Sequence, residues 1–115
     1  MFKILLTLGV LTAAITAGGA NAASFDCAKA RTPDEKTICR TQALSDADVK
    51  MATLFKVNTH LVMMGSRGEM QDRQRAWLAD RAKCASNIKC LTAAYARRNQ
   101  ELERDFDAIA SRGPF

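Results

Sequence analysis

Apolar residues recur at three- and four-residue steps along most of the chain, the spacing that one face of an α-helix requires. Three long stretches follow it: Ser45 to about Met64, Glu69 to about Ala85, and Asn87 to Gly113. No stretch alternates apolar and polar residues over the length of a strand. The pattern therefore predicts an all-α fold. The apolar residues at this spacing are expected to form the interior, and Arg81 lies on the same side of its stretch as Trp77. These apolar residues are Met51, Leu54, Phe55, Leu61, Val62, Met70, Trp77, Leu78, Cys84, Leu91, Ala94, Tyr95, Leu102, Phe106 and Ile109.

A short helix is expected ahead of these three. Thr32-Pro33-Asp34-Glu35 combines a threonine cap, a proline at the first helical position and a glutamate three residues after the cap. In this arrangement the threonine hydroxyl and the glutamate carboxylate bind each other's free backbone N–H groups. We expect this helix to end at Cys39.

Polar residues also mark the other helix ends. Ser45, followed by Asp46 and Asp48, predicts the start of the second helix, and Gly65–Gly68 predicts the break after it. Asn87 is expected to cap the last helix. Because the connections are short, consecutive helices should pack antiparallel. We therefore expect a small antiparallel helical bundle with a short N-terminal helix plus three longer helices.

The first 22 residues have the pattern of a Sec-type secretory leader. Lys3 supplies the positive end, residues 4–17 are apolar, and Ala20-Asn21-Ala22 is a small-x-small cleavage site. The apolar run is shorter than the roughly 20 residues that a membrane span needs. We expect cleavage after Ala22, which leaves residues 23–115 as a single domain in the bacterial periplasm or secreted, with no membrane span.

Composition narrows the class of protein. The 115 residues include 17 basic and 12 acidic side chains, a net charge of +5, and loss of Lys3 with the leader leaves +4. The chain has no internal repeats and no low-complexity stretches, which excludes a repeat array and a disordered tail. A domain of this length buries about two-thirds of its unfolded surface, so its stability should be modest.

The four cysteines form two pairs that are close in sequence. An even number of cysteines in a small exported domain indicates disulfides. Four cysteines allow three connectivities, and the local pairs Cys27–Cys39 and Cys84–Cys90 are favoured because each closes a short loop. Their spacing does not match a structural zinc site, and the only histidine, His60, has no ligand partner nearby in sequence. We expect neither a metal nor another cofactor.

Two segments carry a resemblance to a known family. Asp26-Cys27-Ala28-Lys29-Ala30 with Thr32–Cys39, and the Gln-Arg-x-Trp-x-x-x-Arg segment from Gln74 to Arg81, resemble the LprI-like lysozyme-inhibitor N-terminal domain family. The resemblance runs from about Phe25 to Leu102 and implies a small helical domain with two local disulfides. The residues that match the second half of its motif are Gln74, Arg75, Trp77, Arg81, Cys84, Cys90 and Tyr95.

The family name implies a partner, namely lysozyme or another envelope hydrolase. A mature chain at +4 would repel a basic lysozyme unless a local acidic patch overrides the net charge. We expect Trp77 to pack in the core, with its indole N–H bound inside the bundle. Gln74 and Arg81 lie one turn away on either side, where the Gln74 oxygen could accept that bond and Arg81 could pair with acids such as Asp72 and Asp80.

Basic residues in the C-terminal half suggest a second kind of partner. Arg97, Arg98 and Arg104 form a candidate basic surface for an anionic envelope glycan or lipopolysaccharide. The alternative is a solvated helix face, in which Arg97 pairs with Glu101. A structural or stress role in the periplasm is a further alternative. Nucleic acid is not expected, because export separates the protein from it. The chain lacks a phosphate-binding loop, a zinc-hydrolase motif and a nucleophile elbow, so we do not expect an enzyme.

Overall fold

A computed structural model describes residues 22–113, so the expected leader lies outside the described residues apart from Ala22. The elements are a 3₁₀ turn η1 (Cys27–Lys29) and four helices: α1 (Pro33–Arg40), α2 (Gln42–Leu61), α3 (Met64–Lys83) and α4 (Ile88–Ala110). Over residues 22–113 there is no strand. The prediction of an all-α fold with one short helix plus three longer helices is confirmed.

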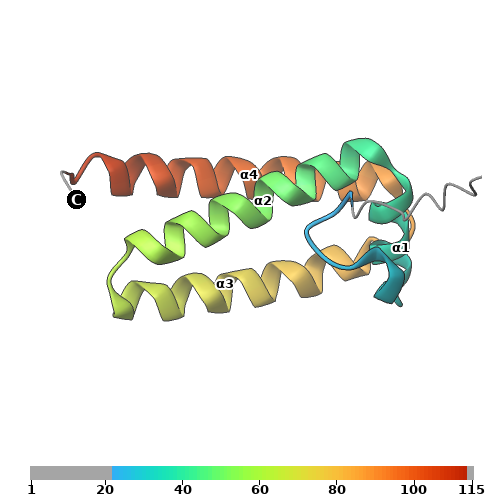
Figure 1. The fold of residues 1–115 in the computed structure, drawn as a ribbon, viewed down its shortest axis with the longest axis horizontal. Coiled ribbons are helices and arrows are strands. Elements are labelled where there is room, and N and C mark those ends of the chain that lie inside the picture. Colours follow the sequence, from blue (N-terminus) through green and yellow to red (C-terminus); the bar gives the residue numbers. More distant parts are fainter. Residues whose placement is uncertain (1–21, 114–115) are drawn as a thin grey trace, which may run out of the picture.

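Consecutive long helices run antiparallel, so α2 and α4 run in the same direction (Figure 1). These two helices form the most extensive contact between elements in the fold. The contact includes hydrogen bonds from side-chain amides to backbone carbonyls, from Asn58 to Leu102 at 2.9 Å and from Asn99 to Ala47 at 3.1 Å. The short α1 lies at one end of the bundle, beside the start of α2 and the end of α3 (Figure 1).

The hydrophobic core is centred near α1. Its fully buried members include Ile38, Leu44, Leu91, Tyr95 and Leu102, from α1, α2 and α4. From α3, the buried residues are Met70, Gln74 and Arg81, so that helix adds more polar than apolar groups to the interior.

Three residues expected in the interior are more exposed than predicted. Leu61, Leu78 and Phe106 are each more than a third exposed, so this part of the core prediction is wrong. The physical reason is that α3 packs through few residues, of which Met70, Gln74 and Arg81 are the buried ones. Leu78 of α3 is therefore left outside the contact, and Leu61 of α2 and Phe106 of α4 are left uncovered.

The start of α1 matches the prediction, but its capping does not. Pro33 is the first helical residue and Thr32 is the cap residue, yet the Thr32 side chain makes no capping hydrogen bond. The Glu35 carboxylate accepts the backbone N–H of Arg31 at 2.9 Å, one residue before the expected partner. The predicted reciprocal capping box is therefore wrong, because the glutamate binds one residue farther back along the chain.

Helix α2 begins at Gln42, a turn before the predicted start at Ser45. The Ser45 hydroxyl donates to the carbonyl of Ile38 at 2.6 Å, beside the backbone N–H of Thr41, so it binds the last turn of α1 and does not cap its own helix. Asp48 is fully buried inside the bundle. The start of α2 was predicted too late because neither side chain caps this helix: Ser45 binds α1, and Asp48 lies in the interior.

Helix α3 begins at Met64, so Gly65–Gly68 lies in its first turns and is not a break. The break is confined to Val62 and Met63, which have extended backbone conformations. The Arg67 side chain donates from Nε to the carbonyl of Thr59 at 2.7 Å and so ties the first turn of α3 to the end of α2. The predicted cap at Asn87 is confirmed, since its side chain accepts the Cys90 N–H at 2.9 Å.

Both predicted disulfides are present. Cys27–Cys39 joins the N-terminal segment to α1, with the two Cα atoms 5.8 Å apart. Cys84–Cys90 joins the end of α3 to the first turn of α4, with a Cα separation of 5.5 Å. Both bridges therefore lie at the end of the bundle that carries α1.

Candidate functional site

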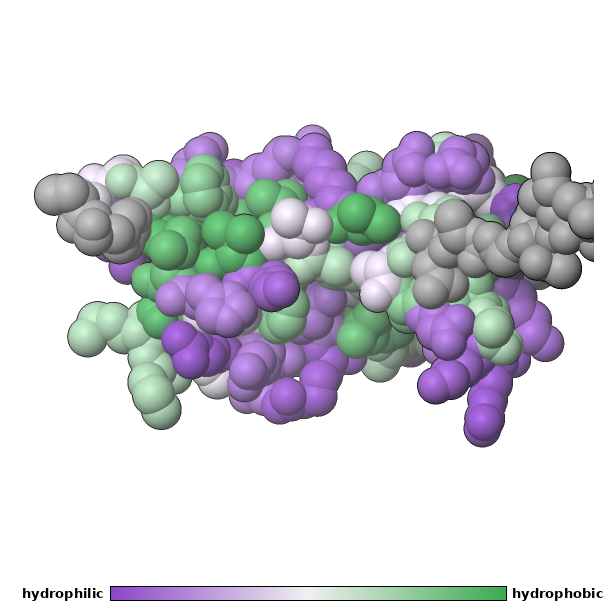
Figure 2. All heavy atoms as spheres, in the orientation of Figure 1, coloured by the Kyte–Doolittle hydropathy of each residue, from purple (hydrophilic) through white to green (hydrophobic). Residues whose placement is uncertain are grey.

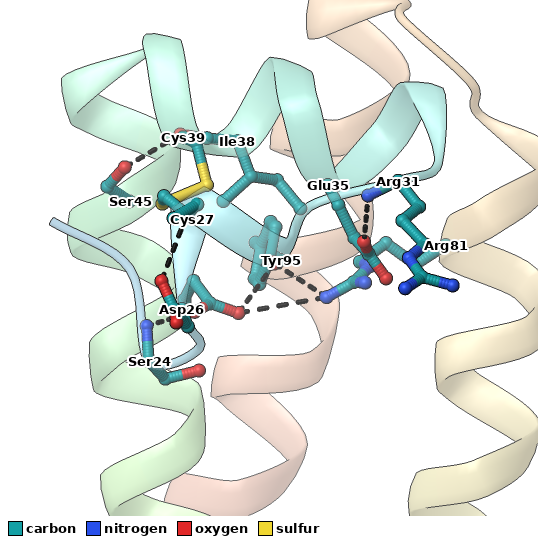
Figure 3. The surroundings of a disulfide bond; sticks show 12 residues. Ser24, Asp26, Cys27, Arg31, Glu35, Ile38, Cys39, Ser45, Arg81 and Tyr95 are labelled. Atoms are coloured by element: carbon teal, nitrogen blue, oxygen red, sulfur yellow. Dashed lines mark hydrogen bonds and ion pairs between the residues drawn. A yellow bond between two sulfur atoms is a disulfide. The ribbon is translucent and has the colours of Figure 1, made fainter. Parts of the chain in front are cut away.

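Four side chains, one from each helix, meet in a buried polar cluster formed by Asp34, Asp48, Arg81 and Tyr95. Figure 3 shows Arg81 directed towards Tyr95. None is more than 7% exposed. Arg81 donates to Asp34 at 2.9 Å and to the Tyr95 hydroxyl at 3.2 Å. Tyr95 in turn donates to Asp48 at 2.8 Å, and the Arg81 guanidinium lies 3.7 Å from the same carboxylate. The cluster therefore links all four helices.

Aromatic rings and the N-terminal segment enclose the cluster. The Arg81 guanidinium carbon lies 5.9 Å from the ring centre of Phe25 and 5.8 Å from that of Trp77, within cation–π range. Trp77 meets Tyr95 edge to face at 5.1 Å between ring centroids. The backbone N–H of Ser24 donates to Asp48 at 2.7 Å, so residues before the first disulfide close one side of the cluster (Figure 3).

The charges in the cluster support one another. Burial of Asp34 opposes its ionisation, but the Thr32 side chain and Arg81 outweigh burial and hold the pKa of this carboxyl below its ordinary 3.8. Burial would lower the pKa of Arg81, yet the Tyr95 hydroxyl and the Asp34 carboxylate, which accept its hydrogen bonds, outweigh burial and raise that pKa above its ordinary value. Both groups are therefore charged at neutral pH.

Tyr95 is held in its neutral form. Burial raises the pKa of the phenol well above its ordinary 10.0, the Asp48 carboxylate adds to that increase, and Arg81 opposes it. A protonated phenol donates to Asp48 while it accepts from Arg81, as the two hydrogen bonds require. Because each of the four groups is buried, their hydrogen bonds and ion pairs hold the four helices together.

The remaining motif residues on α3 have separate partners. Trp77 is half-buried, and its indole N–H donates to the Ala94 carbonyl at 3.3 Å, not to Gln74 or Arg81. Arg81 pairs with acids of α1 and α2, whereas Asp80 pairs with Lys83 at 2.9 Å on the helix surface. Arg75 is exposed and pairs with Asp72.

The expected basic surface is smaller than predicted. Arg98 is only 3% exposed, so its assignment to that surface is wrong. Its guanidinium donates to the Gln74 side-chain oxygen at 3.1 and 2.9 Å and to Glu101 at 3.0 Å, and these two groups make its burial possible. Arg97 and Arg104 are exposed and, seven residues apart, lie on the same face of α4.

A second candidate site lies at the opposite end of the bundle and was not predicted. We call it the α2–α3 end, formed by the groove residues Leu61, Val62, Met63, Ser66, Ile109 and Arg112 together with the exposed Met64. Met63 and Met64 are 85% and 82% exposed. Met63 lines a groove of about 180 Å³, and an adjoining groove of about 160 Å³ shares Val62, Ser66, Ile109 and Arg112 with it. Apolar side chains gather there on the face shown in Figure 2. Two adjacent methionines at a predicted helix break were the available signal in the sequence.

Within residues 22–113, no three histidine, cysteine or acidic side chains gather in a way that could hold a metal ion. His60 is exposed, and its Nδ1 lies 2.7 Å from the Lys56 carbonyl of the same helix. No helix in this part of the chain has the length and apolar character that crossing a membrane requires. Comparisons with known protein families, curated proteins and solved structures found no match.

Proposed function

We propose that the protein is an exported, non-enzymatic binding domain of the bacterial cell envelope and that it binds a partner protein through its α2–α3 end. The two disulfides support an oxidising compartment, as the periplasm or the cell exterior provides. The resemblance to the LprI-like family makes a lysozyme or another envelope hydrolase the candidate partner.

The exposure of Met63 and Met64 is the observation that carries this proposal. Methionine and arginine are enriched in protein interfaces, and flexible methionine side chains adapt to the shape of a partner. The neighbouring groove adds Val62 and Ile109 as apolar lining and Arg112 as a charged rim. The α2–α3 end thus combines an apolar centre with polar edges, the usual anatomy of an interface.

The charge at this end is balanced, so it does not add to the repulsion that the net charge of the domain implies. The 160 Å³ groove is lined by two acidic and two basic side chains, Glu69 and Asp105 beside Arg73 and Arg112. Asp105 and Arg73 lie 3.4 Å apart and partly neutralise each other. A basic lysozyme that approaches the groove would therefore meet a balanced surface.

Binding of an anionic envelope glycan is the second candidate function. It is favoured by Arg97 and Arg104, which lie exposed on one face of α4. Contacts of this kind depend on charge, so retention on peptidoglycan or lipopolysaccharide should fall steeply as salt is added. Retention that disappears in Arg97→Ala/Arg104→Ala would favour the glycan, whereas no retention at low salt would eliminate it.

The test of the proposed function is direct binding. The exported protein, with both disulfides intact, is passed over immobilised lysozymes of several classes and over purified envelope hydrolases. Met63→Ser/Met64→Ser should weaken binding at least tenfold. Val49→Ser, which replaces another exposed apolar residue on α2, is the matched control and should bind as the natural chain does. If both variants bind as tightly as the natural chain, the partner does not bind through the α2–α3 end.

A further inference from the structure

The polar cluster contains more negative than positive charge. Asp34 and Asp48 are carboxylates, Arg81 is the single guanidinium, and Tyr95 is neutral. One oxygen of Asp34, Oδ1, is also buried without a hydrogen-bond partner among the described residues. Buried charges are ordinarily balanced and buried acceptors paired. Among the described residues, one negative charge of the cluster is therefore not balanced by a cation.

The N-terminal segment brings a nitrogen atom close to this charge. The backbone N–H of Ser24 donates to Asp48 Oδ2 at 2.7 Å. Ala23 is 7% exposed and packs in the hydrophobic core. Its own nitrogen lies one residue back, roughly 3–4 Å from that of Ser24 by covalent geometry. The Ala23 nitrogen is therefore within about one further residue length of the Asp48 carboxylate.

We propose that cleavage after Ala22 converts the Ala23 nitrogen into an ammonium group that pairs with buried Asp48 and balances the charge of the polar cluster. The inference rests on the predicted cleavage position, and it does not depend on the proposed binding function. Hydrolysis by a signal peptidase adds the OH of water to the Ala22 carbonyl carbon and its hydrogen to the Ala23 nitrogen. That amine then takes up a proton from solvent.

The surrounding groups favour the charged amine. Asp48 from α2, Asp34 from α1 and Asp26 from the N-terminal segment are acidic, whereas Arg81 from α3 is basic and Tyr95 from α4 is neutral. An opposite charge within about 4–6 Å raises the pKa of an amine above its usual 7.7–8.0, and here that attraction has to outweigh burial, which lowers the pKa. Stability gained from the pair is then fully present below about pH 7.7 and is lost as pH rises through the raised pKa.

The experiment compares two exported chains made from the full sequence with its leader. One has the natural junction, and the other carries Gly-Ser inserted between Ala22 and Ala23, which moves the amine away from Asp48. Mass spectrometry establishes each N-terminus. The pKa of the terminal amine is followed through the carbon chemical shifts of labelled Ala23 in the first chain and of the new terminal glycine in the second. Thermal unfolding is measured between pH 6 and pH 10.

The natural chain should show an amine pKa at least about one unit above 7.7–8.0, and the inserted chain should not. At pH 6 the natural chain should unfold about 4–8 °C higher, and the difference should disappear towards pH 10. Asp48→Asn should abolish the difference between the chains; if that variant does not fold, the amine pKa of the natural chain decides. An unshifted pKa, equal unfolding temperatures at pH 6, or a product that starts at another residue would overturn the proposal.

Discussion

The guanidinium of Arg81 donates to the carboxylate of Asp34 at 2.9 Å, and this bond joins residues 47 positions apart in the chain. Both side chains are buried, and each is the other's nearest opposite charge. The pair connects α3 to α1 where α3 offers few apolar contacts. Removing one partner would leave an unpaired charge in the interior, which is more damaging than losing the whole pair.

Arg81→Ala should therefore destabilise the fold by about 3–5 kcal/mol, measured as the free energy of unfolding in urea. The change leaves two buried carboxylates without their cation and removes the stacking on Phe25 and Trp77. Lys83→Ala is the matched control on the same helix, because it breaks only the exposed pair with Asp80. Similar losses from the two variants would show that the cluster contributes no more than a surface ion pair.

Acid should weaken the fold through Asp34. Because the folded pKa of this carboxyl is below its ordinary 3.8, the unfolded chain binds the proton first as pH falls. Its contribution is complete above about pH 4 and disappears as pH drops through the folded pKa. The free energy of unfolding is measured from pH 6 to pH 2 for the natural chain and for Asp34→Asn. Their difference should shrink in acid, and a constant difference would contradict the assignment.

Alkaline titration should report on Tyr95 alone, since the chain has one tyrosine. Phenolate absorbance at 295 nm should not appear near pH 10 while the domain is folded, because burial and Asp48 raise the pKa of the phenol. In denaturant the same group should titrate near its ordinary 10.0. The unfolded chain loses its proton first, so stability should fall above pH 10. Ordinary titration in the folded protein would refute the buried hydrogen bond to Asp48.

The two disulfides should differ in their contribution. By restricting the unfolded chain, each bridge adds roughly 2–3 kcal/mol to the free energy of unfolding, and the longer loop of Cys27–Cys39 adds slightly more. Cys27–Cys39 also holds the segment that places Ser24 against Asp48 and Phe25 against Arg81. Replacing this pair by serines should therefore reduce the free energy of unfolding more than replacing Cys84 and Cys90. The reverse order would show that the N-terminal segment adds little to the cluster.

Local chemistry was sufficient to predict the helices and their covalent links. The cysteine pairs, Pro33 at the start of α1 and Asn87 at the start of α4 act on residues next to them in sequence, and all lie as predicted. The start of α2 was missed because Ser45 resembles a cap while its hydroxyl binds a carbonyl seven residues earlier. A sequence pattern does not distinguish these two uses of the same side chain.

Burial of the charged residues could not be predicted in the same way. Asp34 resembles a first-turn acid, and Arg98 resembles part of a solvated face. Their partners, Arg81 and Gln74, belong to another helix and meet them only when the bundle forms. The exposed Met63 and Met64 were missed because the glycines predicted the break at residues 65–68. The break is instead at Val62 and Met63, and it places the two methionines at the turn between α2 and α3.

The most direct test is to measure the fall in turbidity as lysozymes of several classes lyse bacterial cells, with and without this protein. The natural chain should slow lysis by at least one class, and Met63→Ser/Met64→Ser should lose that protection while its unfolding temperature stays that of the natural chain. Val49→Ser should protect normally. No protection at a large molar excess would contradict inhibition of lysozyme, and full protection by the double variant would contradict binding through the α2–α3 end.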